Sequence, residues 1–430
     1  MMDRRTFLSM ALAGQTAQRP NVVLFMSDDM GWADLGCYGS PDIRTPHIDR
    51  LAREGVKMTD CYSNGPVCTP TRCGLMTGRY QQRYGRALEW ALMATDKNLG
   101  LSPKHATIAR LLKSAGYKTA IHGKWHLGLA AEFNPIHHGF DEYFGIRGGN
   151  TDMYSKEDRF KNYDLYDGLK ESRAPGYLTD LIAARAVRFV DANRANPFFL
   201  YVPFNAVHWP FQAPGRPESV RELKTWYDGT RGNEYKAMLE SMDGAVGKVL
   251  SALDRNGLAD NTLVIFTNDN GGERLSDGGP FRNGKATLWE GGLRVPALLR
   301  WPGKLPKGKT SRQAAMSMDL TATIAAACGV RAAAGEPFDG VDLTPLLNGK
   351  EIERDLFWRI NRPGQRAVAV RSGKWKYVVD GSINNLYDLS KDSGETRDLY
   401  YEFPEVALAL RKKIEAWEAQ FFGINSGARG

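Results

Sequence analysis

Two nearly continuous apolar segments stand out in the hydrophobic and polar pattern of the chain. Residues 22–26 read Val-Val-Leu-Phe-Met, and residues 263–267 read Leu-Val-Ile-Phe-Thr. Short apolar runs of this kind are typical of parallel strands that are covered on both faces. Two further strands are expected at 117–121 and 198–204. Helical spacing of apolar residues predicts helices over residues 45–54, 107–115, 177–193 and 234–256.

The pattern changes near residue 350, where the apolar segments become shorter. We expect three short strands and a final helix there, at residues 367–370, 375–379, 385–388 and 404–421. This order is typical of a small antiparallel sheet with a helix packed on it. Residues 133–177 are rich in Gly, Asn, Asp and Tyr without periodicity, so we expect an irregular insertion that shapes a binding pocket.

Length and charge narrow the class of protein. A chain of 430 residues with 42% hydrophobic residues can bury a large core. Its net charge of +8 is spread along the sequence without long basic runs. Such a balance fits an anionic ligand but does not indicate a nucleic acid partner.

The N-terminal segment has the features of an export signal. Arg4 and Arg5 precede a short apolar run, and small residues lie near Ala13 and Ala17. This resembles a bacterial twin-arginine export signal over residues 1–17 and favours a periplasmic location, with a cytosolic N-terminus as the alternative. The apolar run is too short to span a bilayer, which takes about 20 apolar residues.

Five cysteines leave at least one thiol unpaired, because their number is odd. Cys37 and Cys61 could form a disulfide, but the sequence alone does not decide this. Cys328 lies at the end of an apolar run and fits a helix core. The chain is therefore no disulfide scaffold.

Oxygen-rich residues follow both strong strands. Asp28 and Asp29 come directly after the first strand, and Asp269 and Asn270 come after the second. Ligand sites in open α/β sheets lie beyond the carboxyl ends of the strands. Adjacent carboxylates repel each other unless a cation neutralises them. Oxygen ligands without thiolates or imidazoles favour Ca²⁺ or Mg²⁺ over zinc, whereas a solvated turn is the simpler reading of an isolated Asp-Asp pair.

Basic residues follow other predicted strands. Lys124 and His126 follow the strand at 117–121, and His208 follows the strand at 198–204. Lys124 and His126 together could stabilise an oxyanion, although a single such residue is usually only exposed or a packing residue. Lys285 lies in a glycine-flanked turn and is weak evidence by itself.

Cys68 precedes Thr69-Pro70 at the expected start of a helix. A side chain at this position faces free backbone N–H groups and the positive end of the helix dipole, which suits chemistry on an anion. The alternative from spacing alone is a buried or disulfide-bonded cysteine.

The run from Cys68 to Arg72, Cys-Thr-Pro-Thr-Arg, resembles the signature of the formylglycine-dependent sulfatases. In that family the cysteine of Cys-x-Pro-x-Arg is oxidised to formylglycine, and Thr71 stands here in place of the usual serine. Similar segments extend over most of the chain: Asp28-Asp29, Thr77-Gly78-Arg79, Gly123-Lys124-Trp125-His126, Gly139-Phe140-Asp141, His208, Asp269-Asn270-Gly271, Gly284-Lys285, Glu290-Gly291-Gly292, Lys374-Trp375-Lys376 and Leu386-Tyr387-Asp388.

The resemblance is strongest to the arylsulfatase A and N-acetylgalactosamine-6-sulfatase branch. It implies an α/β fold like that of alkaline phosphatase, with a large mixed sheet flanked by helices. We expect a catalytic domain over residues 20–349 and a small antiparallel-sheet subdomain with a helix over residues 350–430.

The resemblance also implies a role for each site residue. Asp28, Asp29, Asp269 and Asn270 would hold Ca²⁺, with Mg²⁺ as the other candidate ion, and would be joined by the formylglycine made from Cys68. Arg72 and Lys124 would stabilise the hydrated aldehyde. Lys124, Lys285 and His208 would bind sulfate, His208 would protonate the leaving alcohol, and His126 would accept a proton. Further substrate contacts are expected at Arg147, Asn150, Asp152 and Arg282.

The implied activity is hydrolysis of a sulfuric ester, with release of sulfate from a sulfated carbohydrate. A formylglycine-generating enzyme would be the partner during maturation. One alternative is a formylglycine-dependent phosphonate monoester or phosphodiester hydrolase. Another is a non-catalytic protein that binds sulfated glycans, which would apply if Cys68 stays a thiol. The sequence does not indicate which sugar is bound or the oligomeric state.

Overall fold

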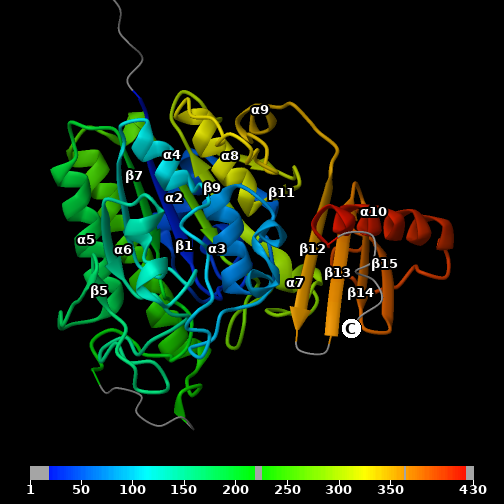
Figure 1. The fold of residues 1–430 in the computed structure, drawn as a ribbon, viewed down its shortest axis with the longest axis horizontal. Helices are drawn as coiled ribbons and strands as arrows, with labels where there is room; N and C mark the ends of the chain where they lie inside the picture. Colours follow the sequence, from blue (N-terminus) through cyan, green and yellow to red (C-terminus); the bar gives the residue numbers. More distant parts are fainter. Residues whose placement is uncertain (1–18, 218–224, 363–364, 423–430) are drawn as a thin grey trace, which may run out of the picture.

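A computed structural model describes residues 19–217, 225–362 and 365–422. The predicted export signal at 1–17 lies outside these residues. The chain forms a large α/β body and a smaller body of strands with one helix beside it (Figure 1). This arrangement confirms the predicted fold class.

The described part of the large body is built on a mixed sheet of eleven strands. Strand β11 (Ala315–Met316) pairs with β2 off the main path. The order along the main path is β10 (Lys309–Ser311), β2 (Val56–Tyr62), β9 (Arg294–Arg300), β8 (Thr262–Asn268), β1 (Asn21–Ser27), β7 (Phe198–Pro203), β3 (Lys118–His122), β4 (Glu142–Gly145), β5 (Tyr166–Asp167) and β6 (Lys170–Glu171).

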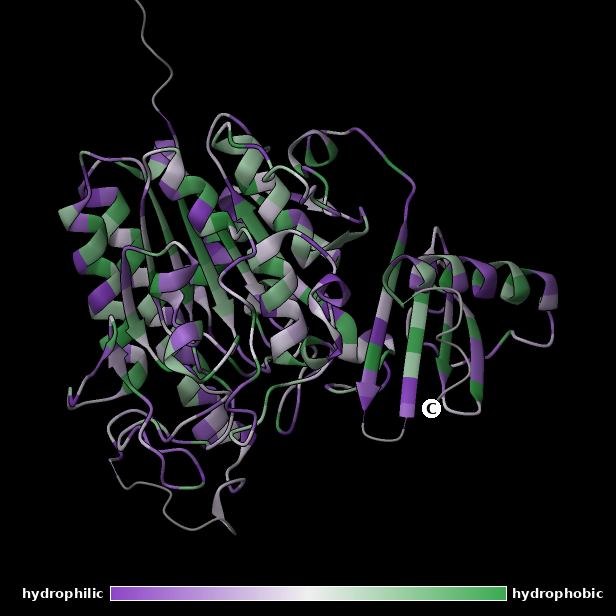
Figure 2. Ribbon diagram, viewed as in Figure 1, coloured by the Kyte–Doolittle hydropathy of each residue, from purple (hydrophilic) through white to green (hydrophobic). Residues whose placement is uncertain are grey.

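The central strand β1 separates two hydrophobic cores. Val23 and Phe25 point into one core, and Val22, Leu24 and Met26 point into the other. Successive side chains of a strand face opposite sides, so a strand covered on both faces must be apolar throughout. Figure 2 shows this as a hydrophobic centre beneath more polar helices.

Each face of the sheet is covered by its own helices. The first core contains side chains from α2 (Pro46–Glu54), α5 (Leu178–Ala192) and α6 (Lys236–Arg255). The second contains side chains from α3 (Cys68–Thr77), α4 (Ile108–Ser114) and α8 (Ser317–Ala327). Short helical turns connect these elements at Gly36–Tyr38, Gln81–Tyr84, Arg86–Glu89, Ala131–Phe133, Pro135–His138, Arg231–Tyr235, Ala259–Asn261, α7 (Glu290–Leu293) and α9 (Thr344–Leu347).

The predicted long strands and helices are confirmed. Two expectations were wrong in part: the C-terminal sheet has a fourth strand, β12 (Asp355–Arg362), that the sequence pattern did not predict, and the insertion at 133–177 contains a strand. This segment is not wholly irregular, because its residues 142–145 form β4 and pair in parallel with β3. Four residues, Glu-Tyr-Phe-Gly, are too few to show a period in the sequence.

All five cysteines are free, including Cys37 and Cys61.

The C-terminal body is an antiparallel sheet with a helix on one face. Its strands are β12 (Asp355–Arg362), β13 (Gln365–Ser372), β14 (Trp375–Asp380) and β15 (Ile383–Asp388), and its helix is α10 (Pro404–Phe422). Val368 and Val370 pack with α10 residues such as Leu410. Ala367 and Ala369 belong to a core shared with Leu288 of the large body.

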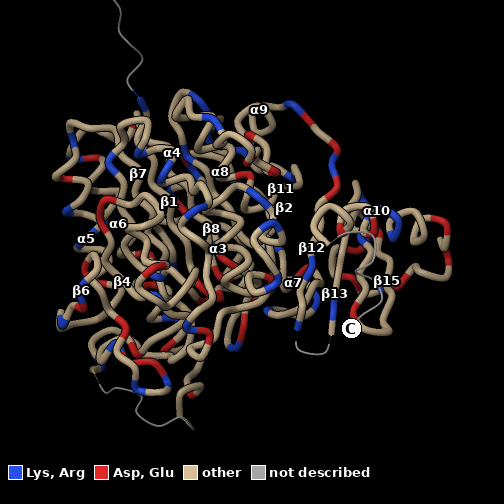
Figure 3. Tube along the Cα trace, viewed as in Figure 1, with Lys and Arg blue, Asp and Glu red and all other residues tan. Residues whose placement is uncertain are grey.

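A buried ionic cluster joins the two bodies. Lys376 Nζ on β14 lies 2.8 Å from Glu290 Oε1 of α7 and 2.9 Å from Glu395 Oε1. The backbone N–H of Glu290 donates to Glu395 Oε2 at 2.6 Å. Lys and Arg are intermixed with Asp and Glu over the whole fold (Figure 3). The three charged side chains of this cluster are fully buried. The cluster therefore fixes α7 against the C-terminal sheet.

Replacing Lys376 by methionine should strongly destabilise the protein, because two buried carboxylates would lose their shared cation. Loss of one partner from a buried ion pair costs about 3–5 kcal/mol. The control is Lys374→Met in the turn just before the same strand, where the side chain is 50% exposed beside Asp388. An exposed pair contributes at most about 1 kcal/mol. Urea unfolding measures the free energy of unfolding of both variants. Equal losses of this free energy would contradict the assigned role of the cluster.

Candidate active site

The two predicted oxygen clusters lie side by side because their strands are neighbours. Strands β1 and β8 are parallel, and Ser27 is aligned with Asn268. The next residues therefore leave the sheet at the same edge, as expected for a site beyond the carboxyl ends of strands. One ligand atom from each of Asp28, Asp29, Cys68 and Asp269 falls within 4.8 Å of the others, and all four residues are buried.

Asn270 completes this group and has an unused oxygen. Its side-chain amide donates to Asp29 Oδ1 at 2.8 Å, while its buried Oδ1 has no hydrogen-bond partner. Burial, and then repulsion from Asp269, raises the pKa of Asp28 well above its ordinary value. Three crowded carboxylates and a free amide oxygen fit a hard divalent cation.

Cys68 is the first residue of α3, whose ten residues are all buried. Its thiol donates to Asp28 Oδ1 at 3.6 Å, and Lys124 Nζ donates to its sulfur at 3.4 Å. The Thr71 hydroxyl donates to Gly65 O at 3.0 Å and accepts from Gly65 N at 3.2 Å. The hydroxyl common to Ser and Thr thus closes the loop before the cysteine, which explains why threonine is tolerated here.

Arg72 ties three segments of the site together. Its Nη2 donates to Asp269 Oδ2 at 2.8 Å, and its Nη1 donates to Lys124 O at 3.0 Å. Lys124 Nζ donates to Asp28 Oδ2 at 2.6 Å and is fully buried. The preceding Gly123 has φ 139°, and a Cβ there would overlap the Pro203 carbonyl. Only glycine can therefore lead the chain from β3 to Lys124.

His126 is buried with one ring nitrogen free. Its Nε2 lies 2.8 Å from Leu92 O, and its Nδ1 has no partner. Burial, and then the charge of Lys124, lowers the pKa of His126 well below its ordinary value, so the ring is neutral. A carbonyl only accepts hydrogen bonds, so Nε2 carries the proton and the Nδ1 lone pair is available as a base.

Lys285 and His208 form a second polar group beside the carboxylates. Lys285 Nζ donates to Asp29 Oδ2 at 2.6 Å and lies 3.4 Å from His208 Nε2. Although burial favours the neutral amine, Asp29 holds the pKa of Lys285 well above its ordinary value. Burial, together with Lys285, lowers the pKa of His208 to about 3. The lysine is therefore the cation of this pair.

Glu273 and Trp209 are site residues that sequence reasoning missed. Glu273 Oε2 accepts from Lys285 Nζ at 3.1 Å and from the Trp209 indole at 3.0 Å. Burial, and then repulsion from Asp29, raises the pKa of Glu273 to about 7. The position of Glu273 four residues after Asp269, on the same strand-end loop, was the available signal.

A cavity of about 610 Å³ opens onto these groups. Cys68, His126, His208, Lys285 and Glu273 line its polar part. Its rim includes aromatic and polar side chains from 90–98 and 147–166, including Trp90, Arg147, Asn150, Phe160, Tyr163 and Tyr166. The predicted pocket-forming insertion therefore contributes to this cavity.

The predicted substrate contacts divide into two groups. Arg147 and Asn150 line the cavity, whereas Asp152 and Arg282 do not. Asp152 is buried and accepts from Gln212 Nε2 at 2.9 Å and from the backbone of Tyr154. Its carboxylate holds its own loop, a common use of aspartate in loops.

Arg282 faces the C-terminal sheet instead of the cavity. It is exposed and donates to the Tyr387 hydroxyl and the Glu395 carbonyl, both at 3.2 Å. Arg282 is close to Lys285 in sequence, but its side chain contacts the C-terminal body, whereas Lys285 lines the cavity.

Residues 20–330 match the family model described as Sulfatase. The chain belongs to the sulfatase family. Residues 282–420 also match the model of the C-terminal part of N-sulphoglucosamine sulphohydrolase. The protein is therefore a sulfuric ester hydrolase, as the named relatives also support.

Three curated sulfatases are similar over most of the chain. Steryl-sulfatase of Mus musculus is 36% identical, covering 95% of this chain and 82% of its own. N-acetylgalactosamine-6-sulfatase of Rattus norvegicus is 35% identical, covering 85% and 72%. Arylsulfatase A of Homo sapiens is 35% identical, covering 99% and 94%. The predicted branch of the family is thereby confirmed.

The fold of this sulfatase is also found in solved structures. The crystal structure of Ps i-CgsB in complex with k-i-k-neocarrahexaose superposes with a TM-score of 0.87. The two sequences are 31% identical, and the match covers 95% of this chain and 94% of the other. None of the described helices combines the length and apolar character needed to cross a membrane.

Proposed function

We propose that this sulfatase uses a formylglycine made from Cys68, together with Ca²⁺, to release sulfate from a sulfated carbohydrate. The observation that carries the proposal is the position of Cys68. It stands at the start of a buried helix, between Asp28 and Lys124, and faces the cavity. As an aldehyde hydrate, this residue would supply one hydroxyl to attack sulfur and a second through which sulfate is later expelled.

The residues that would hold the ion are Asp28, Asp29, Asp269 and Asn270, joined by residue 68. The unpartnered Asn270 Oδ1 and the crowded carboxylates support this assignment. Mg²⁺ also prefers oxygen ligands and is the other candidate ion. The ion would neutralise the carboxylates and the negative charge of the sulfate group.

Lys124 and Lys285 are the cations that we assign to the sulfate oxygens. Fixed positive charges in a buried site stabilise the charge that builds up on these oxygens in the transition state. Their ion pairs with Asp28 and Asp29 hold both ammonium groups in place before substrate binds. Arg72 holds Asp269 and the Lys124 backbone, so we assign it to the support of the nucleophile.

We assign the leaving-group proton to His208 and the base to His126. The Lys285 ammonium faces His208 Nε2, so this pair holds a proton next to the cavity. The free Nδ1 of His126 can accept the proton of the second hydroxyl. An acid for the departing alcohol and a base for the next step are the two proton transfers that this chemistry requires.

The cavity supports a sugar as the substrate. Trp90, Tyr163, Tyr166 and Trp209 line it together with polar side chains. Aromatic rings offer apolar faces, while polar groups fix orientation. The names of the relatives, which include an N-acetylgalactosamine-6-sulfatase, and the neocarrahexaose bound to Ps i-CgsB support a carbohydrate.

We propose export by residues 1–17 to the bacterial periplasm and oxidation of Cys68 by a formylglycine-generating enzyme. We further propose a catalytic domain at 20–349 and a subdomain at 350–430.

The enzyme assay compares 4-nitrophenyl sulfate with an aryl phosphodiester and an aryl phosphonate monoester. We expect faster turnover of the sulfate ester by mature protein in the presence of Ca²⁺. Faster turnover of either phosphorus ester would favour the phosphonate monoester or phosphodiester hydrolase instead. Binding of sulfated oligosaccharides without any turnover would favour the non-catalytic glycan-binding protein.

A further inference from the structure

Arg147 carries a positive charge into the cavity beside the buried carboxylate of Asp164, with which its guanidinium group forms no ion pair. Its guanidinium group forms no ion pair or side-chain hydrogen bond with any described residue, and its buried Nε is unpartnered. The guanidinium carbon lies 3.8 Å from the centre of the Tyr166 ring. Stacking on the ring holds the group flat and leaves its N–H edge free to donate.

The backbone holds Arg147 close to the catalytic groups. Its carbonyl accepts from the His126 N–H at 3.1 Å. Its own N–H donates to Asp164 Oδ1 at 2.9 Å, and Gly148 N–H donates to Asp164 Oδ2 at 2.7 Å. Each oxygen of Asp164 therefore already accepts a backbone hydrogen bond. A Cβ on Gly149 would lie 2.9 Å from the His126 ring, so this loop passes directly beside the imidazole.

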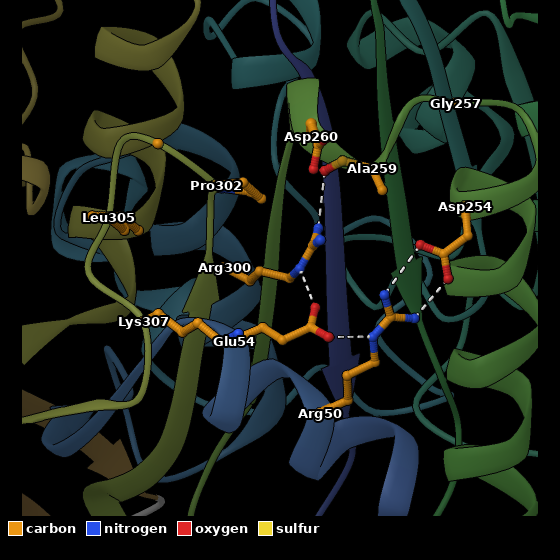
Figure 4. Close-up of a pocket in the computed structure, with 11 residues that line it drawn as sticks. Arg50, Glu54, Asp254, Gly257, Ala259, Asp260, Arg300, Pro302, Leu305 and Lys307 are labelled. Carbon is orange, nitrogen blue, oxygen red and sulfur yellow. Dashed lines mark hydrogen bonds and ion pairs between the residues drawn. The ribbon is translucent and has the colours of Figure 1, made fainter.

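Two arginines that line another cavity differ from Arg147, because both pair with acidic side chains. A separate cavity of about 550 Å³ lies at the opposite end of β8 from Asp269 (Figure 4). There Arg50 pairs with Glu54 and Asp254, and Arg300 pairs with Glu54. A half-buried arginine without such a partner is suited to an anion that arrives with a ligand.

We propose that Arg147 binds a second anionic group of the substrate. The substrate would then be a carbohydrate that carries another sulfate ester or a uronate carboxylate near the sulfate that is hydrolysed. Lys97 and Arg159 line the same cavity and add positive charge around it. Asp158, the other acid on this rim, accepts from the backbone N–H groups of Phe160 and Asn162. This inference rests on the proposed sulfatase function and specifies its substrate.

The test compares three matched sulfated disaccharides: one with a single sulfate, one with a second sulfate and one with a uronate. 4-Nitrophenyl sulfate is the reference substrate without a second anion. We expect Arg147→Met to lower kcat/KM by about 10- to 100-fold for the sugar with the preferred second anion. Turnover of 4-nitrophenyl sulfate should stay within about twofold, because it makes no contact of this kind. The sugar with the larger loss identifies whether the group is a sulfate or a carboxylate.

Arg173→Met is the matched control. Arg173 also stacks on a tyrosine, Tyr163, at 3.7 Å, but it pairs with Glu171 and does not line the cavity. It should leave the preference among the three sugars unchanged. Equal losses of Arg147→Met on all four substrates would overturn the inference, as would no loss on any of them.

A binding measurement separates failure of this inference from failure of the proposed function. Calorimetry on Cys68→Ala protein measures the affinity of the same three sugars without turnover. Tighter binding of a doubly anionic sugar, lost on adding Arg147→Met, supports the second anion site even if no sulfate ester is hydrolysed. Equal affinities for the three sugars would reject it even if 4-nitrophenyl sulfate is a good substrate.

Discussion

Cys68→Ala should abolish sulfate release, with a loss on the order of 10⁴-fold or more in kcat. The alanine variant keeps both lysines and the four other residues assigned to the ion, Asp28, Asp29, Asp269 and Asn270, but has no group that can become the nucleophile. Such a loss is expected because the remaining groups can stabilise charge without forming the bond to sulfur. The measurement is release of 4-nitrophenol from 4-nitrophenyl sulfate in the presence of Ca²⁺.

Cys73→Ala provides the matched control for this variant. Cys73 lies on the same helix and is equally buried, but its side chain belongs to the hydrophobic core. Its substitution should lower stability modestly through lost packing and leave turnover within about twofold. Comparable inactivation by both substitutions would show that disturbance of α3, rather than loss of the nucleophile, explains the effect.

Removal of divalent cations with a chelator should inactivate the enzyme and lower its thermal stability. Asp28, Asp29 and Asp269 are buried within one small cluster, and repulsion among them is relieved by a bound cation. A ligand at 1,000 times its Kd stabilises a protein by about 4 kcal/mol. We expect Tm to fall by roughly 4–5 °C, because the unfolding entropy of a chain of this length is on the order of 0.9 kcal/mol/K. Differential scanning calorimetry and the aryl sulfate assay measure the two effects, and added Ca²⁺ should restore both.

Two substitutions locate this effect. Asp269→Asn should remove the shift of Tm caused by Ca²⁺, because it removes a charged ligand. Asp34→Asn alters a buried aspartate that interacts with Arg231 and Tyr235 outside the cluster. That variant should be less stable but should keep the Ca²⁺-dependent shift. Unchanged activity and Tm after chelation of the wild-type protein would contradict the metal assignment.

The parts of the site that the sequence predicted are those fixed by strand ends. The strands at 22–26 and 263–267 are apolar enough to be recognised as buried, and polar residues follow each directly. Because these strands are parallel neighbours, the residues that follow them lie side by side once the sheet has formed. No other long-range contact is needed to bring them together. The same reasoning placed Lys124, His126 and His208 at the site.

The parts that the sequence could not predict depend on side-chain direction and distant contacts. Asp152 lies in the predicted pocket-forming segment, yet its carboxylate turns back onto its own loop. Arg282 lies close to Lys285 in sequence, yet it contacts residues about a hundred positions later. The free Nδ1 of His126 depends on a hydrogen bond to Leu92 O from another loop. None of these contacts has a local sequence signal.

The position of Lys285 also depends on contacts with the C-terminal body that have no local sequence signal. Glu395 holds the N-terminus of α7 at Glu290, and Lys376 neutralises both carboxylates. The segment between Arg282 and Glu290 is thus attached at both ends to the C-terminal body, and Lys285 lies within it. Short strands after residue 350 predicted this body, but not that it supports the active-site lysine.

Peptide mass analysis across Cys68 tests the central claim most directly. The protein is produced together with a formylglycine-generating enzyme, and the same sample is assayed with 4-nitrophenyl sulfate. We predict that the CH₂SH side chain is replaced by CHO and that sulfate release increases in proportion to the converted fraction. An unmodified Cys68 in a sample that still hydrolyses the sulfate ester would contradict the proposed nucleophile.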